Sequence, residues 1–258
     1  MFNFVLIELT NYCNFNCYHC PHAILTRSKG FMTFELYKSI VDQAIPITKE
    51  INFGYFGEQL LHPEFYKFMR YLKNKPIKIM INTNFSLITN RHRKLFLDIN
   101  LTELRVGLGN IRVKANQDVV TLKLKDWFKK EHSPTKLVYT ITSNNKDNQH
   151  EFVKLWEPYL DKKDSILSKT MLTYGGKMKD TEIITHACNE NIRKNLVISW
   201  DGKVSPCHLD TEMNLEIGDA TTETLKSIYT HSYKKLGVSD ICNDCVDGGV
   251  SKKMVYKK

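Results

Sequence analysis

The chain has 258 residues, of which 42% are hydrophobic and 25% charged, so it can bury a substantial core and is neither disordered nor fibrous. Lysine and arginine outnumber aspartate and glutamate by 37 to 28, but the lysines are scattered and no basic block is interleaved with aromatic residues, so nucleic acid is a disfavoured partner. No stretch reaches the roughly 18 uncharged apolar residues of a membrane span, and the start lacks a basic leader. We therefore expect a cytoplasmic protein with no membrane partner.

Strands and helices alternate along the first two thirds of the sequence. The first apolar run reads as a buried strand, and after a long cysteine-bearing loop Thr33 is placed to cap a helix with apolar residues at helical spacing. This alternation predicts an α/β fold with a parallel sheet, open or partly closed into a barrel, and chemistry at the carboxyl ends of the strands. The expected strands are 4–10, 50–56, 77–83, 103–108, 137–142 and 166–172, and the expected helices are 34–44, 63–74, 89–98, 118–130 and 151–160.

The pattern changes after Gly176. A short strand at 196–200, a turn at Asp201-Gly202, a strand at 203–206 and a helix at 222–230 are expected there. A unit this small rarely has a stable core without a cross-link such as a bound metal. This segment contains four cysteines that could bind one. We therefore expect two domains, 1–180 and 181–258.

Three cysteines, Cys13, Cys17 and Cys20, follow the first strand directly. Cysteines in a chain without an export signal are expected to stay reduced, which favours metal or redox chemistry over disulfides. Three thiolates can hold a four-iron, four-sulfur (4Fe-4S) cluster and leave one iron open to a ligand that is not protein. A structural zinc ion would instead recruit a fourth protein ligand, for which His19 and His22 are the candidates.

The CxxxCxxC spacing in this position resembles that of the radical S-adenosylmethionine (SAM) superfamily. The resemblance implies a partial (β/α)6-type TIM barrel with a 4Fe-4S cluster on Cys13, Cys17 and Cys20, whose open iron is chelated by SAM. It also implies reductive cleavage of SAM to a 5′-deoxyadenosyl radical, which removes a hydrogen atom from the substrate. A flavodoxin or ferredoxin would be the electron donor.

Further segments are similar to the SAM-binding segments of that superfamily. Gly57 and Glu58 follow the second strand, where the superfamily has a Gly-Gly-Glu segment that binds the SAM ammonium. Asn84 ends the third strand near the expected ribose contact, Gly107 lies on the strand expected to line the adenine, and His19 could stack on the adenine ring. Each of these residues also has a purely structural interpretation, as a turn carboxylate, a strand-end residue or a solvated loop histidine.

The second group of cysteines is Cys188, Cys207, Cys242 and Cys245. Four thiolates close a metal site, and a structural zinc ion is one possible occupant. The arrangement resembles the short "twitch" form of the SPASM extension, which implies an auxiliary 4Fe-4S cluster. All seven cysteines are then assigned, so none is left to return a hydrogen atom in an epimerisation. An auxiliary cluster without an open iron suits the uptake of one electron, and hence a two-electron oxidation.

Residues 7–13, 172–176, 200–207 and 241–245 resemble the radical SAM dehydrogenases of aminoglycoside biosynthesis, which oxidise a secondary alcohol to a ketone. The resemblance predicts an oxidoreductase that acts on a small hydroxylated substrate, including sugar-like ones. Tyr174 and Lys169 are candidates to assist deprotonation, although a buried hydroxyl and a solvated lysine are the more ordinary interpretations.

Two other functions stay open at this stage. One is a peptide-modifying maturase, although a catalytic strand that begins by Phe4 leaves no room for a leader-peptide domain. The other is a non-catalytic iron-sulfur or zinc protein with a degenerate barrel, suggested by Phe56 and Phe85 at positions where the superfamily usually has glycine.

Overall fold

One curved sheet organises the part of the chain that can be described. The computed structural model describes residues 2–108, 135–142, 146–169, 195–231 and 254–256, and positions 120, 122–124, 127, 172, 174, 177 and 178. Neighbouring strands among the first six pair in parallel and stand in sequence order, as the alternating pattern predicted. These strands are β1 (Phe4–Ile7), β2 (Glu50–Phe53), β3 (Lys78–Thr83), β4 (Glu103–Gly107), β5 (Lys136–Thr142) and β6 (Ser165–Lys169).

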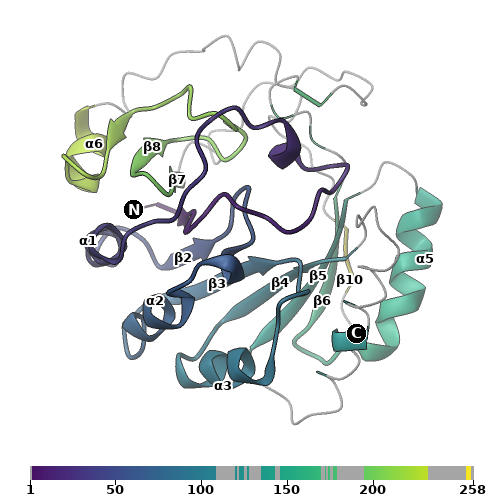
Figure 1. The fold of residues 1–258 in the computed structure, drawn as a ribbon. Coiled ribbons are helices and arrows are strands. Elements are labelled where there is room, and N and C mark those ends of the chain that lie inside the picture. The colour runs from purple at the N-terminus through teal and green to yellow at the C-terminus, as the bar shows by residue number, and fades with distance from the viewer. Residues whose placement is uncertain are drawn as a thin grey trace.

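Helices follow one another around the outer side of this sheet (Figure 1). Positions 120, 122–124 and 127 are also helical and fall within the expected helix 118–130, whose other positions lie outside the described residues. None of the described helices is long and apolar enough to cross a bilayer. The helices are α1 (Phe34–Ala44), α2 (Phe65–Tyr71), α3 (Asn90–Asp98) and α5 (Lys146–Trp156), and the short 3-10 turns are η1 (Pro21–Ile24), η2 (Gln59–Leu61) and η3 (Glu157–Tyr159).

The C-terminal segment extends the same sheet beyond β1. The predicted hairpin is present as β7 (Asn195–Ile198) and β8 (Lys203–Ser205), followed by β9 (Gly218–Asp219) and α6 (Leu225–His231). β7 pairs in parallel with β1, a continuity that the sequence did not reveal. At the other edge β10 (Met254–Tyr256) pairs antiparallel with β6, so the strand order is β10-β6-β5-β4-β3-β2-β1-β7-β8-β9. The domain boundary near residue 180 stays a prediction.

The main core lies between the sheet and the outer helices. Thr33 caps α1 as predicted, because its side chain accepts a hydrogen bond from the Leu36 amide. Tyr37 is fully buried and packs against Phe68, with ring centroids 4.4 Å apart, while its hydroxyl donates to the Phe68 carbonyl oxygen over 2.9 Å. Aromatic packing, with the buried Tyr37 hydroxyl hydrogen-bonded, therefore joins α1 to α2.

The inner face of the sheet is much more polar. In β4, Leu104 and Val106 belong to the core, whereas Glu103 and Arg105 alternate with them and form an ion pair with each other at 2.5 Å. Asn82 of β3 donates to the Asn52 side chain of β2 over 2.6 Å. The structure thus places polar side chains on the concave side of the barrel strands.

β1 is shorter than the predicted strand 4–10. Beyond Ile7, the Leu9 amide donates to the side chain of Gln59 over 2.7 Å instead of joining a regular strand ladder. Thr10 forms an isolated antiparallel bridge with Phe31. The chain leaves the sheet at this point and begins the loop that carries the first three cysteines.

His92 of α3 makes the stability of this fold sensitive to acid. Its Nδ1 atom accepts a hydrogen bond from the Thr89 amide over 3.2 Å, which requires a neutral ring. Burial lowers the pKa of His92 to about 4. As the pH falls below about 6.5, His92 is protonated in the unfolded chain but stays neutral in the folded chain. The contribution of His92 to the free energy of unfolding is therefore fully present above about pH 6.5 and is lost as the pH falls toward 4.

We expect His92→Gln to reduce this acid sensitivity. Between about pH 7.5 and 5 the unfolding free energy of the wild type should fall by about 1–2 kcal/mol more than that of the variant. Urea unfolding of both proteins at the two pH values measures the difference. Equal losses in both proteins would show that His92 does not contribute.

Candidate active site

The loop between β1 and α1 holds the three cysteines predicted to bind the first cluster. Cys13, Cys17 and Cys20 are all partly buried and free of disulfides, and the Cys20 amide donates to the Cys17 carbonyl oxygen over 3.2 Å. Burial, with a smaller contribution from the charge of Cys17, raises the pKa of Cys13 to about 11 and that of Cys20 to about 12. Thiolates here are stable only with added positive charge, which the irons of a cluster supply.

A single zinc ion is the alternative to a cluster at this loop. Within the described residues, no three histidine, cysteine or acidic side chains converge as ligands of one ion. Cubane thiolates each bind a different iron and stand farther apart than the ligands of one zinc ion. His22, one of the two candidate zinc ligands, is buried with its Nε2 atom 3.0 Å from the Asn11 carbonyl oxygen. The structure therefore gives no support to the zinc alternative at this loop.

Glu58 is buried directly beside the cysteine loop. Its side chain is 2% exposed, and its Oε1 atom accepts hydrogen bonds from the Thr83 hydroxyl at 2.9 Å and the Leu60 amide at 3.2 Å. The Oε2 atom accepts from the Asn84 amide at 2.7 Å. Burial raises the pKa of Glu58 to about 7, and no cationic side chain of the described residues pairs with it. A buried carboxylate in this state is suited to receive a cationic group from a ligand.

Three of the predicted site segments meet at this point. The Glu58 amide donates to the Tyr12 carbonyl oxygen over 2.9 Å, and the Asn84 side chain donates to the Asn14 side chain over 2.9 Å. The ends of β2 and β3 are therefore both attached to the cysteine loop.

Gly57 is required by close packing, whereas Gly107 is not. A Cβ atom on Gly57 would lie 2.0 Å from the Thr10 carbonyl oxygen, so only glycine lets the loop after β2 approach the cysteine loop. A Cβ atom on Gly107 would meet the Thr140 hydroxyl at 3.8 Å, an ordinary contact. His19 lies beside Tyr18, with ring centroids 5.6 Å apart. Contacts of Gly57, Gly107 and His19 with SAM stay predictions.

The two phenylalanines at glycine positions have clear packing roles. Phe85 adopts a φ of 64°, the left-handed region that favours glycine, and its buried ring packs against Trp127 with centroids 5.5 Å apart. Phe56 is 5% exposed and packs against Tyr55 at 4.1 Å and Tyr174 at 5.7 Å. Both side chains pack into the fold, so their presence does not by itself indicate a degenerate barrel.

Of the second group of cysteines, the structure describes Cys207. It follows β8 and is partly buried, and its sulfur accepts a hydrogen bond from the Leu209 amide over 3.4 Å. Cys188, Cys242 and Cys245 lie outside the described residues, so the complete ligand set stays a prediction.

Of the candidates for deprotonation, Tyr174 lies against Phe56 and Lys169 is the last residue of β6.

Sequence reasoning missed three polar residues that organise this end of the sheet. Gln59 is fully buried and bonds to the Leu9 amide and, through Nε2, to the Gly57 carbonyl oxygen at 3.1 Å. Glu8 and Arg27 form a buried ion pair at 2.5 Å. The sequence indicated that Glu8, a glutamate inside an apolar strand, needs a cationic partner, but it did not indicate which arginine or lysine is that partner.

Comparisons with known proteins agree with this geometry. The sequence matches the model of the radical SAM superfamily over residues 7–141 and that of an iron-sulfur cluster-binding domain, SPASM, over residues 188–246. A tungsten-containing aldehyde ferredoxin oxidoreductase cofactor-modifying protein of Pyrococcus furiosus is 26% identical over 80% of this chain and 70% of its own length. The S-adenosyl-L-methionine-dependent 2-deoxy-scyllo-inosamine dehydrogenase of Niallia circulans is 23% identical over 99% of this chain and 97% of its own.

Solved structures share the fold. BtrN in complex with AdoMet and 2-DOIA superposes with a TM-score of 0.70 at 16% identity and covers 98% of this chain and 96% of its own. Streptococcus suis SuiB bound to precursor peptide SuiA has a TM-score of 0.71 at 14% identity, over 91% of this chain and 66% of its own. At these identities the likeness shows a common architecture.

Proposed function

Since this chain belongs to the radical SAM superfamily and is therefore an enzyme, we propose that it oxidises a small hydroxylated substrate by two electrons. The observation that carries the proposal is the length of the match to the 2-deoxy-scyllo-inosamine dehydrogenase, which spans 99% of this chain and 97% of that protein. Both cysteine segments fall within it. The correspondence therefore includes the auxiliary segment as well as the barrel.

The cofactors of the two matched domains are 4Fe-4S clusters and SAM. In this proposal Cys13, Cys17 and Cys20 hold the first cluster, and Glu58 and Asn84 lie where SAM binds. The chemistry that a reduced cluster and SAM supply when bound is the generation of a 5′-deoxyadenosyl radical. The buried thiols fit this cluster because iron lowers their high pKa, and the buried Glu58 fits the SAM ammonium because it has no cationic partner among the described residues.

Cys207, together with Cys188, Cys242 and Cys245, is proposed to hold the auxiliary cluster in a domain that spans 181–258. An auxiliary cluster held by these residues would supply an acceptor for one electron, so that loss of a hydrogen atom, a proton and an electron from the substrate would amount to a two-electron oxidation. Tyr174 and Lys169 are the proposed candidates for the base. A flavodoxin or ferredoxin is the proposed external electron donor.

A peptide-modifying maturase is the less supported alternative. The likeness to SuiB covers 66% of that protein, and at 14% identity it shows the fold alone. The full-length correspondence with a dehydrogenase of small molecules favours a small substrate.

The proposal is tested by incubating anaerobically reconstituted enzyme with SAM, dithionite and pools of hydroxylated metabolites. Mass spectrometry should detect a product two hydrogens lighter than its substrate, formed in step with 5′-deoxyadenosine. The matched control, Cys207→Ala, should still release 5′-deoxyadenosine but form little product. A product of unchanged mass, or one made equally well by Cys207→Ala, would overturn the oxidative assignment.

A further inference from the structure

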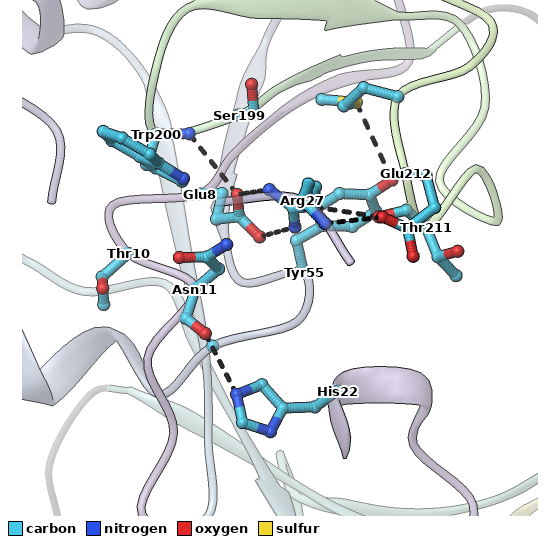
Figure 2. A network of polar contacts seen from close by, with 12 residues as sticks. Glu8, Thr10, Asn11, His22, Arg27, Tyr55, Ser199, Trp200, Thr211 and Glu212 are labelled. Atoms are coloured by element: carbon cyan, nitrogen blue, oxygen red, sulfur yellow. Dashed lines mark hydrogen bonds and ion pairs between the residues drawn. The ribbon is translucent and has the colours of Figure 1, made fainter. Parts of the chain in front are cut away.

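A buried ion pair connects the later part of the cysteine loop to Glu8, the residue that follows β1. The guanidinium of Arg27 donates to the Glu8 carboxylate through Nη1 at 2.6 Å and Nη2 at 2.5 Å (Figure 2). Glu8 is completely buried and the Arg27 side chain is 12% exposed. A bidentate pair held out of water fixes both position and orientation. Arg27 comes seven residues after Cys20, so the pair fixes the end of the cysteine loop.

The same arginine is held by the segment that follows Cys207. Its Nε atom donates to the Thr211 carbonyl oxygen over 2.9 Å, and its backbone amide donates to the Glu212 carboxylate over 2.9 Å. Glu212 also accepts from the amide of Thr26 at 3.1 Å and from its hydroxyl at 3.0 Å. One carboxylate thus receives two successive backbone amides of the cysteine loop.

Tyr55 brings the loop before Glu58 into the same set of contacts. Arg27 lies over the Tyr55 ring, 5.5 Å from its centroid, and the Tyr55 hydroxyl donates to the Asp210 carbonyl oxygen. The Tyr55 ring also packs against Phe56, with centroids 4.1 Å apart. Tyr55 has a φ of 98°, so the backbone accepts strain to place the ring there.

We propose that Arg27, Glu212 and Tyr55 are positioning residues that couple the Cys207 segment to the SAM-binding cluster site. We call them, with Glu8 and Thr211, the Arg27 network. The network contacts the loop after Cys20, the loop before Glu58 and the segment after Cys207, and it joins them at the buried end of β1. The inference rests on the proposed SAM site but does not depend on the identity of the substrate.

A second contact shows how closely the C-terminal hairpin fits the cysteine loop. The Trp200 indole donates to the Ser28 carbonyl oxygen over 3.2 Å, and a Cβ atom on Gly30 would lie 2.4 Å from the Trp200 ring. Asn11 holds the same stretch from the β1 side, donating to the Ser28 carbonyl oxygen at 2.8 Å and accepting from the Gly30 amide at 2.9 Å. The loop after Cys20 is therefore held from both sides, by the C-terminal hairpin and by the residues that follow β1.

The test uses Glu212→Gln and Tyr55→Phe in anaerobically reconstituted protein. Both substitutions preserve side-chain volume, and Tyr55→Phe removes only one O–H donor. The readouts are iron content, SAM affinity by equilibrium dialysis, and the electron paramagnetic resonance spectrum of the dithionite-reduced protein with and without SAM. Glu216→Gln is the control, because Glu216 lies in the same segment and forms an exposed ion pair with Lys203 at 3.0 Å, outside the network.

We expect both variants to keep the iron content of the wild type but to bind SAM about tenfold more weakly, the size of effect seen when residues behind a metal site are changed. The SAM-dependent change in the spectrum should be altered in the variants and unaltered in Glu216→Gln. Arg27→Lys keeps the positive charge beside Glu8 but loses the planar guanidinium group. It should therefore reduce SAM affinity less than Arg27→Met does. If Glu212→Gln loses iron, Tyr55→Phe alone decides the test.

Wild-type affinity and spectra in both Glu212→Gln and Tyr55→Phe would overturn the inference and leave the network as ordinary packing. Failure of the proposed function would look different. In that case the wild-type protein itself would show no spectral response to SAM.

Discussion

Cys17→Ala is expected to abolish the formation of 5′-deoxyadenosine and to remove about half of the iron, from about eight to about four atoms per chain, if each group of cysteines holds one cubane cluster. Cys17 lies between Cys13 and Cys20 in the same loop, and a cluster with one open iron needs all three thiolates. The two thiols that remain cannot retain a cubane, and their burial keeps them protonated in its absence. Anaerobic iron and sulfide analysis and chromatography of the SAM cleavage products measure the two effects.

Cys207→Ala is the matched control, because it removes one thiol from the other group and leaves the loop of Cys13, Cys17 and Cys20 intact. It should also lose about half of the iron but keep the release of 5′-deoxyadenosine. Retained cleavage of SAM by Cys17→Ala would contradict the assignment of the first cluster. A wild-type content of about four irons and one zinc would confine the cluster to the first loop and remove the oxidative role of the C-terminal segment.

The order of the barrel strands could be predicted because the sequence alternates regularly between strand-like and helix-like segments. The strand segments of β1 and β2 alternate with helical spacing in α1, and parallel neighbours in sequence order follow from that alternation. The cysteine spacing was equally local, since Cys13, Cys17 and Cys20 share one loop. Features that depend on a few consecutive residues were therefore visible in the sequence.

Features that join distant segments were not visible. The pairing of β7 with β1 brings Asn195 beside Phe4, and nothing in either strand distinguishes this partner from another. The contacts of Arg27 with Glu8 and of its backbone with Glu212 depend on the folded path of the loop. Such pairings arise from tertiary packing, so a single sequence indicates that a buried charge needs a partner but does not identify it.

Glu58→Gln is expected to weaken SAM binding by about 10- to 100-fold, the range for loss of a hydrogen bond to a charged group. The variant keeps the size of the side chain but removes the charge available to the SAM ammonium. The Glu58 carboxylate now accepts hydrogen bonds from three donors, which are the Thr83 hydroxyl and the amides of Leu60 and Asn84. In the variant, at least one of these donors would face the NH2 group of the glutamine, which is itself a donor. The unfolding free energy should fall by about 1–3 kcal/mol if that contact is not relieved. Equilibrium dialysis with SAM and urea unfolding measure the two effects separately.

Glu64→Gln provides the control, because Glu64 lies six residues away with a side chain 47% exposed and pairs with Lys67 at 2.8 Å. Surface pairs of this kind contribute little, so SAM affinity and stability should both match the wild type. If Glu58→Gln lowers stability but binds SAM as well as Glu64→Gln does, Glu58 only ties the loop after β2 to the end of β3. The SAM ammonium would then have to be held by other groups at the ends of these strands, and the charge of Glu58 would have no part in the reaction.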